Sequence, residues 1–173
     1  MFELDIQVVQ DDPQLPTEAQ CLSWLAAAQA ELVAYDANEF ADKNYAITLR
    51  FVDAVESQQL NGTYRGINKP TNVLSFPVDD WDEAGLPAEL LAELGTPHLG
   101  DLVFCVPVIL AEAQEMAISP EAHWAHLLVH GYLHLHGFDH LDDDEAALME
   151  GLESKIMRQL GFADPYEEAG VAD

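Results

Sequence analysis

Hydrophobic and polar residues recur along the chain in patterns that predict both strands and helices. Alternating or β-branched and aromatic runs predict four strands, at residues 2–9, 45–52, 72–76 and 101–106. Apolar residues at one-turn spacing predict helices at 17–34, 108–116, 120 to about 136, and 142 to about 160, with a shorter piece at 54–60. The mixture predicts an α+β fold, with a small mixed sheet of about four strands packed with helices.

Residues of characteristic type mark the ends of the last two predicted helices. Pro120 follows a serine that suits the N-cap, so we expect a helix from Pro120 to about His136, and Gly137 to end it. Asp142, with Glu145 three residues later, resembles a capping box for the next helix. We expect that helix to bury a stripe at four-residue spacing, formed by Leu148, Leu152, Ile156 and Leu160.

The length of 173 residues suits one domain. We assign it to residues 1–162, with an acidic insertion at 79–97, and expect residues 163–173 to fray. No apolar run approaches the roughly 20 residues that cross a bilayer, and the first residues lack a basic leader. Cys21 and Cys105 lie in apolar segments and form no CxxC, which indicates buried thiols. We therefore expect a cytoplasmic protein without a membrane partner.

The chain is strongly acidic. The chain has 32 Asp and Glu against 6 Lys and Arg, a formal net charge of -26. Binding of nucleic acid depends on Lys and Arg that neutralise phosphates, so the average argues against such a partner, and no DNA partner is expected. A solvated acidic surface accounts for the average. Arg65 and Lys69 form a local exception, in the segment YRGINKPT that we expect to be a loop after a turn at Asn61 and Gly62.

The segment HGYLHLHGFDH, residues 130–140, holds four of the seven histidines. On a helix, His130 and His134 lie one turn apart on the same face, so both rings can reach one ion. Gly137 lets the chain reverse, and His140 can then return to the same point. These three side chains supply three corners of a tetrahedron with the fourth position open. The spacing therefore predicts a metal site on this helix and the turn after it.

The remaining histidines are excluded on geometry. His126 shares the stripe but lies ~12 Å along the axis from His134, so it is expected to pack beside the site or support a ligand. His136 lies roughly 200° around the helix from His134 and is expected to face away from the ion. His98 and His123 have no partner at ligand spacing.

Three neutral imidazoles with an open position suit a catalytic zinc, although nickel or copper would also bind such a site. Zinc peptidases place Glu directly after the first histidine, as the general base of H-E-x-x-H. Here that position is Gly131, which disfavours peptide hydrolysis. Asp139 stands beside His140 and either orients a ligand imidazole or lies in a solvated turn.

With YRGINKPTNVLSFP and HLGDLVF upstream in that order, HGYLHLHGFDH resembles the YbeY family of bacterial endoribonucleases, which are zinc-dependent rRNA maturation factors. The resemblance covers roughly residues 61–161. It implies one zinc per chain, with His130, His134 and His140 as ligands and Arg65 as the catalytic arginine. The acidic insertion and the net charge depart from the family without touching these positions.

The resemblance implies a single-strand-specific endoribonuclease of 16S rRNA 3′-end maturation and ribosome quality control, with rRNA and the small ribosomal subunit as partners. The chemistry of the residues agrees, because the guanidinium of Arg65 can give two parallel donors to phosphate oxygens. Lys69 is a weaker candidate for a phosphate contact. In an alternative hypothesis, which the charge favours, the protein is a ribosome-assembly factor that docks on a basic ribosomal protein and uses zinc structurally. A metallopeptidase-like hydrolase is the least favoured alternative.

Overall fold

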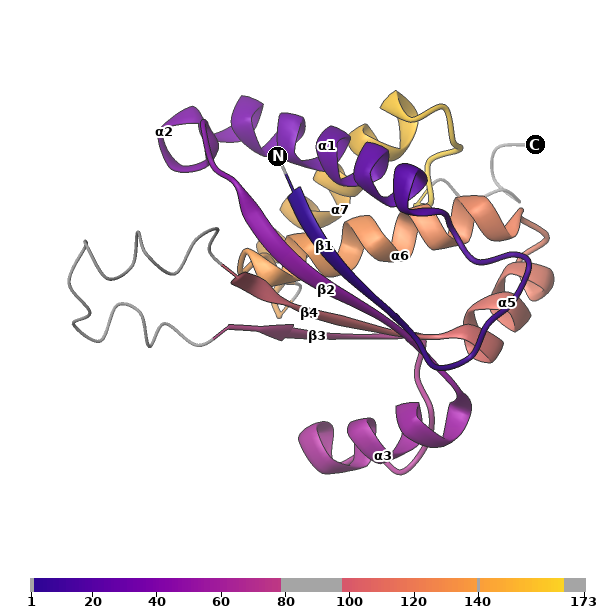
Figure 1. Ribbon diagram of the computed structural model, residues 1–173. Coiled ribbons are helices and arrows are strands. Elements are labelled where there is room, and N and C mark those ends of the chain that lie inside the picture. The colour runs from indigo at the N-terminus through magenta and orange to yellow at the C-terminus, as the bar shows by residue number, and fades with distance from the viewer. Residues whose placement is uncertain (1, 79–97, 140, 167–173) are drawn as a thin grey trace, which may run out of the picture.

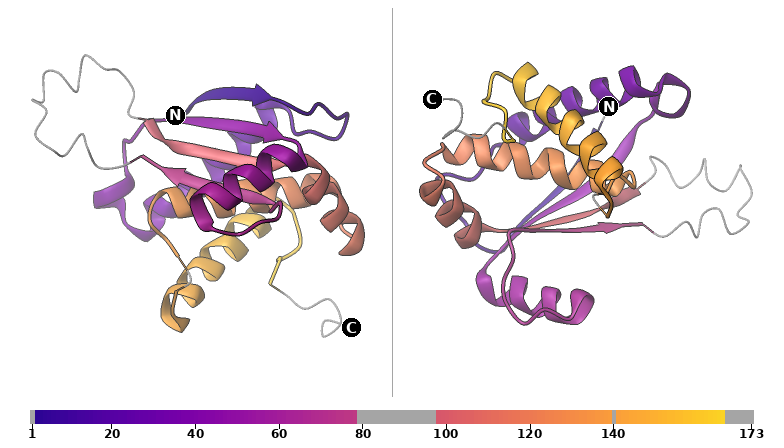
Figure 2. Two further views of the ribbon diagram at one scale, coloured as in Figure 1. Left: turned by 90° about the horizontal axis from the view of Figure 1, so that it is seen from below. Right: turned by 180° about the vertical axis from the view of Figure 1, so that it is seen from behind.

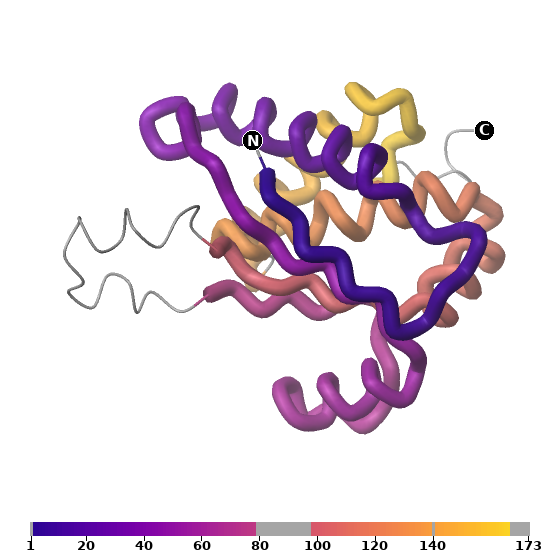
Figure 3. Tube along the Cα trace, in the orientation of Figure 1, coloured from indigo at the N-terminus to yellow at the C-terminus, as the bar shows by residue number. Residues whose placement is uncertain are grey.

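A mixed four-stranded sheet forms the centre of the computed structural model, which describes residues 2–78, 98–139 and 141–166 (Figure 1). The strand order is β1-β2-β4-β3, and the bounds are β1 (Phe2–Val8), β2 (Tyr45–Val52), β3 (Val73–Pro77) and β4 (His98–Cys105). β1, β2 and β4 are parallel, and Figure 3 shows β1 and β2 side by side along the trace. β3 pairs antiparallel with β4 and forms one edge. The predicted α+β fold and its sheet are therefore confirmed.

Helices cover both faces of the sheet (Figures 1 and 2). The described helices are α1 (Glu18–Tyr35), α2 (Ala37–Phe40), α3 (Ala54–Arg65), α5 (Val106–Glu115), α6 (Pro120–Leu135) and α7 (Asp143–Gln159). α1 and α6 lie on one face and α3 on the other, while α7 packs on α1 and α6. The four residues of α2 were not predicted, because so short a helix gives no periodic signal.

The central helix α6 packs closely on the sheet. Trp124 is 1% exposed, and its ring meets Phe51 of β2 and Phe104 of β4 edge-on, at centroid distances of 5.5 and 6.0 Å. Further along, a Cβ added at Gly131 would lie 2.8 Å from the side chain of Leu102. Because Gly131 has no side chain, α6 approaches β4 directly, and this contact fixes the height of the histidine-bearing turn above the sheet.

The predicted turn at Asn61 and Gly62 is wrong, because α3 continues to Arg65. Asparagine favours turns when its side chain bonds to its own backbone. Here Asn61 is buried and its amide donates to the carbonyl of Lys69 at 2.8 Å. Gly66, with φ of 70°, then caps the helix in the left-handed region. Arg65 is thus the last residue of a helix and does not lie in the predicted loop.

The buried stripe of α7 also differs from the prediction. The N-cap is as expected, since the side chain of Asp142 accepts from the N–H of Glu145 at 2.8 Å, but the side chain of Glu145 accepts from the N–H of Leu141 at 3.3 Å, one residue before the cap. Leu152 is 4% exposed, but Leu148 is 38% exposed. A strict four-residue spacing drifts about 40° per step around the helix axis, so the stripe leaves the buried face. Outside the predicted stripe, the helix buries Met149, Glu153, Ser154 and Met157.

The acidic insertion at 79–97 lies outside the described residues, as do 167–173 of the predicted tail. The described part of that tail bonds to α7. The hydroxyl of Ser154 donates to Asp164 at 2.7 Å, and that of Tyr166 donates to Glu153 at 3.0 Å. The domain boundary at 162 stays a prediction. In the described ranges, every helix is too short or too polar to cross a bilayer.

Candidate metal centre and cleft

The end of α6 shows the predicted reversal. Gly137 has φ of 93° and donates its N–H to the carbonyl of His134 at 2.9 Å. The N–H of Phe138 donates to the carbonyl of Leu133 at 3.1 Å. These two bonds form a Schellman motif, which a glycine in the left-handed region permits. The helix therefore ends at Leu135, close to the predicted position.

Two of the predicted ligands converge at this helix end. The Nε2 atoms of His130 and His134 lie 3.1 Å apart, and the side chains are 21% and 22% exposed. Two nitrogens bound to one tetrahedral zinc at about 2.0–2.1 Å would lie about 3.3 Å apart. The pair therefore fits two ligands of a single small cation. The third predicted ligand, His140, lies outside the described residues.

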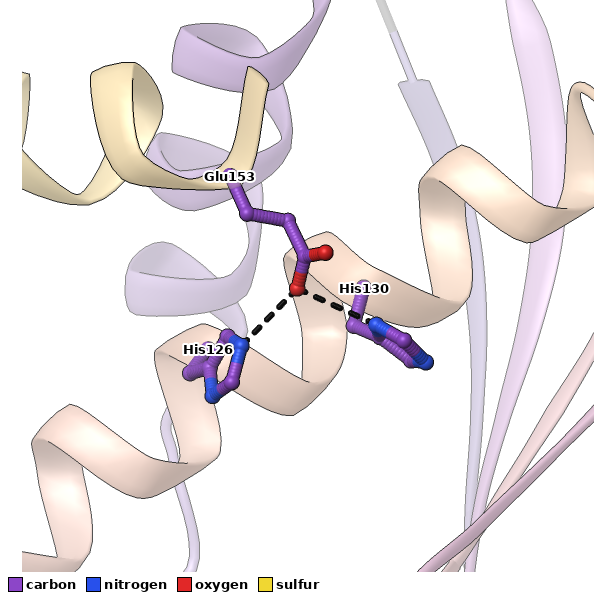
Figure 4. A group of neighbouring side chains, drawn as sticks. All are labelled: His126, His130 and Glu153. Carbon is purple, nitrogen blue, oxygen red and sulfur yellow. Dashed lines mark hydrogen bonds and ion pairs between the residues drawn. The ribbon is translucent and has the colours of Figure 1, made fainter. Parts of the chain in front are cut away.

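A buried carboxylate stands behind this pair, on α7. Glu153 is 0% exposed, and its Oε1 accepts from His126 Nε2 at 2.8 Å and from His130 Nδ1 at 3.0 Å (Figure 4). Its Oε2 accepts from the hydroxyl of Tyr166 at 3.0 Å. Burial alone would raise the pKa of Glu153, but the hydrogen bonds from the two histidines lower it to about 2. The group is therefore a carboxylate at neutral pH.

Sequence reasoning missed Glu153, although the chain carries a signal for it. An acidic residue between Leu152 and Ile156, on the buried face of a helix, requires partners inside the fold. The ligand atoms of His126, His130 and Glu153 all lie within 4.8 Å of one another, so this group could itself hold a metal ion. The structure thus offers two arrangements that share His130.

A cleft of about 670 Å³ opens in front of His130 and His134. The side chains that line it come from the last turn of α3, from β3 with the residues before it, and from the region of α6 and the turn after it: Tyr64, Arg65, Thr71, Asn72, Val73, Leu74, Ser75, Phe76, His130, His134, Asp139 and Leu141. Arg65 and the two histidines thus line one cleft, although α3 and α6 cover opposite faces of the sheet (Figure 1). The edge position of β3 makes this possible.

Three of the six Lys and Arg side chains pair with carboxylates, whereas Arg65 is exposed. Ion pairs join Arg50 to Glu56, Lys155 to Glu31 at 3.8 Å, and Arg158 to Asp164 at 3.8 Å. Within 2–78, 98–139 and 141–166, no ion pair involves Arg65. Its guanidinium can therefore meet an anion that enters the cleft.

The two weaker candidates are placed differently. Asp139 lines the cleft, and its Oδ1 lies 4.0 Å from Nδ1 of His134, too far for a hydrogen bond. Lys69 is exposed and is absent from the described lining of the cleft. Its backbone carbonyl accepts from Asn61, so the residue helps to hold the segment after α3.

The other histidines have partners elsewhere. The ring of His136 packs edge-on against Phe40, Tyr45 and Tyr132, and burial lowers its pKa to about 4. It faces away from His134, as predicted. Nε2 of His123 lies 2.9 Å from Glu112, and Nε2 of His98 lies 2.9 Å from Asp101. A glutamate at position 131, which a peptidase of the H-E-x-x-H type requires, would run into Leu102.

Two comparisons bear on this chain. It is similar to TM1509 from Thermotoga maritima, known from a solution structure, with 19% sequence identity, 97% of this chain and 100% of that chain covered, and a TM-score of 0.48. The family model described as Endoribonuclease YbeY matches residues 7–161, nearly the whole chain. The chain therefore belongs to the YbeY endoribonuclease family, and this membership supports a metal-dependent endoribonuclease role in rRNA maturation.

Proposed function

We propose that this protein is a single-strand-specific, zinc-dependent endoribonuclease that matures the 16S rRNA 3′ end and takes part in ribosome quality control. His130, His134 and His140 hold the zinc, and Arg65 assists cleavage of the phosphodiester. The observation that carries this proposal is the cleft, in which the exposed guanidinium of Arg65 accompanies two imidazoles whose Nε2 atoms lie 3.1 Å apart. Rings and guanidinium can then act on one phosphodiester.

The role of each group in the cleft follows from the charge that develops during cleavage. Negative charge builds on the oxygens of phosphorus, and two parallel N–H donors of Arg65 stabilise it. A zinc ion supplies Lewis acidity and lowers the pKa of water when it is bound. Asn72 adds a polar group whose orientation is fixed, because its amide donates to Glu112 at 3.1 Å. Asp139, at the same cleft, is proposed to orient a ligand imidazole.

The test compares RNA cleavage by metal-stripped, zinc-restored and His134→Ala protein, with matched single-stranded and duplex rRNA fragments. We expect the stripped protein and the variant to be inactive, zinc to restore the parental chain only, and the duplex to resist. Full cleavage by the stripped protein or by His134→Ala would show that the histidines do not form a catalytic metal centre.

The net charge of -26 favours a second candidate, a cytoplasmic ribosome-assembly factor with a structural zinc. An acidic surface suits docking on a basic protein of the small ribosomal subunit. The Arg65→Ala variant distinguishes the two functions, because an assembly factor needs the metal for its fold but does not need the guanidinium for cleavage. Parental RNA cleavage by this variant, together with impaired small-subunit maturation in cells, would favour the second candidate.

A further inference from the structure

Glu153 contacts His130 through Nδ1, the ring nitrogen other than the one that lies near His134, and this contact decides which nitrogen of His130 carries a proton. A carboxylate only accepts hydrogen bonds, so the ring atoms that contact Oε1, His126 Nε2 at 2.8 Å and His130 Nδ1 at 3.0 Å, must both be donors. With a proton on Nδ1, a neutral His130 presents the lone pair of Nε2. That is the atom 3.1 Å from Nε2 of His134.

The surroundings of Glu153 favour support over direct ligation. The side chain is 1% exposed, and neither Glu153 nor His126 belongs to the described lining of the cleft. An ion held by His126, His130 and Glu153 would therefore lie inside the interface of α6 and α7, away from the substrate. An ion on the Nε2 atoms of His130 and His134 faces the cleft.

We propose that Glu153 is a positioning residue, which locks His130 in the Nδ1–H tautomer and directs Nε2 toward the ion in the cleft. His126 and Tyr166 hold the carboxylate in turn, the latter by donating its hydroxyl to Oε2 at 3.0 Å. Carboxylate–histidine–metal arrangements of this kind orient the ligand and raise its basicity. The proposal rests on the proposed function for the position of the metal.

The main variant is Glu153→Gln, which keeps the shape and removes the charge. We expect one zinc per chain to remain, with affinity 10- to 100-fold lower in competition with a chelator. The cobalt-substituted variant should show a shifted absorption spectrum. Tyr166→Phe, which removes one donor to Oε2, should weaken zinc less and is expected to fold normally. Glu150→Gln, one turn earlier on α7, is the control for loss of charge and should bind zinc as the parental chain does.

Nitrogen NMR of the metal-free protein tests the same proposal without the ion. His130 should be in the Nδ1–H tautomer in the parental chain, and should populate both tautomers in Glu153→Gln. Parental zinc affinity in Glu153→Gln, or mixed tautomers in the parental chain, would overturn the proposal. So would complete loss of zinc in both Glu153→Gln and His126→Ala with retention in His134→Ala, which would identify Glu153 as a ligand. Weakened zinc binding without RNA cleavage by the parental chain would contradict only the proposed function.

A second, independent observation concerns the mouth of the cleft. Tyr64 is 65% exposed and lines the cleft beside Arg65. Its ring is braced edge-on by Phe76 of β3, at a centroid distance of 5.2 Å and an interplanar angle of 69°. The chain has only 6 Lys and Arg, so phosphate contacts supply little affinity for a single strand. Stacking of bases on aromatic rings is the other general source of such affinity.

We infer that the Tyr64 ring is a stacking platform for one unpaired base next to the scissile phosphate. This inference also rests on the proposed function, because it needs an RNA strand in the cleft. The braced ring offers a face to a base at low entropic cost, since Phe76 already limits its motion. A single-stranded substrate suits it, because the bases of a duplex are already stacked on their neighbours.

The experiment measures binding of a short, cleavage-resistant 2′-O-methyl single strand to zinc-loaded protein, with an abasic site moved along the strand. One abasic position should weaken binding to the parental chain about 5- to 100-fold, the range for one stacked base. Tyr64→Ala should weaken binding of the intact strand by the same factor, and an abasic site at that position should then have no further effect. Tyr64→Phe and Tyr64→Trp should bind the strand as the parental chain does. Tyr35→Ala, which removes a tyrosine 50% exposed on α1, is the control.

Parental binding of the intact strand by Tyr64→Ala would overturn the inference, as would an abasic profile that is the same in both proteins. Position-specific loss without cleavage of natural RNA would leave the platform standing and contradict the nuclease. Cleavage of natural RNA at a rate that does not depend on Tyr64 would support the nuclease and contradict the platform.

Discussion

His130 and His134 present their Nε2 atoms to each other at 3.1 Å across one turn of α6. Two like imidazole nitrogens approach so closely when an ion or a proton lies between them. We therefore predict one zinc per chain, which is lost in each of His130→Ala, His134→Ala and His140→Ala. Metal analysis of purified variants by mass spectrometry measures the stoichiometry.

His136→Ala and His126→Ala are the controls for this prediction. His136 packs among aromatic rings away from the ion, and His126 bonds to Glu153. Both variants should keep nearly one zinc per chain, His126→Ala with reduced affinity. An empty site in His136→Ala would overturn the ligand assignment.

Substitution of Arg65 should lower the rate of RNA cleavage and leave folding unchanged. Arg65→Ala is expected to keep the zinc content and the free energy of unfolding of the parental chain, because the side chain is exposed. It should reduce the cleavage rate about 100-fold or more, the scale for loss of a preorganised donor to a developing charge. Arg65→Lys should recover only part of the rate, because an ammonium cannot grip two oxygens in parallel. Single-turnover cleavage gives the rates.

Arg158→Ala is the matched control, because it removes another exposed arginine, on α7, that pairs with Asp164. It should cut RNA at close to the parental rate. If Arg158→Ala and Arg65→Ala lost activity equally, a general loss of positive charge would explain both, and the specific role of Arg65 would be refuted.

His136 should make the fold sensitive to acid. Burial lowers its pKa from 6.5 to about 4, so between these pH values the unfolded chain binds a proton that the folded chain does not. The free energy of unfolding therefore falls as the pH falls through this window. His136→Phe suits the aromatic surroundings. As the pH falls from about 7.5 to about 4.5, its free energy of unfolding should rise by about 2 kcal/mol relative to that of the parental chain. Urea unfolding of both metal-free proteins measures it, and parallel pH profiles would contradict it.

Local patterns in the sequence were sufficient for most of the fold. The capping residues of α6 and α7 act on their own backbone, so Asp142 and Gly137 could be interpreted without tertiary information. The predicted turn at Asn61 failed for the opposite reason. Its amide bonds to the carbonyl of Lys69, a contact that only the packed fold creates.

The same distinction between local and tertiary contacts applies to the residues of the site. His130 and His134 lie one helical turn apart, so their convergence follows from helix geometry alone. Glu153 comes from another helix, and its approach to His130 depends on how α7 packs across α6. Arg65 reaches the cleft only because β3 is an edge strand between α3 and α6. Contacts between elements far apart in the chain leave no periodic signal in one sequence.

The charge leads to a last prediction, about binding of RNA. The chain has 6 Lys and Arg in all, and three of them, Arg50, Lys155 and Arg158, pair with carboxylates. The protein should therefore neutralise only about one to three phosphates, and the logarithm of its affinity for naked single-stranded rRNA should fall with log salt at a slope of about -1 to -2. Binding to intact small subunits should be tighter, because a basic ribosomal protein would hold the acidic surface near the RNA. Titrations across a salt series with both substrates measure this. Tight binding of naked RNA with a steep slope would reveal a basic surface and remove the need for a protein tether.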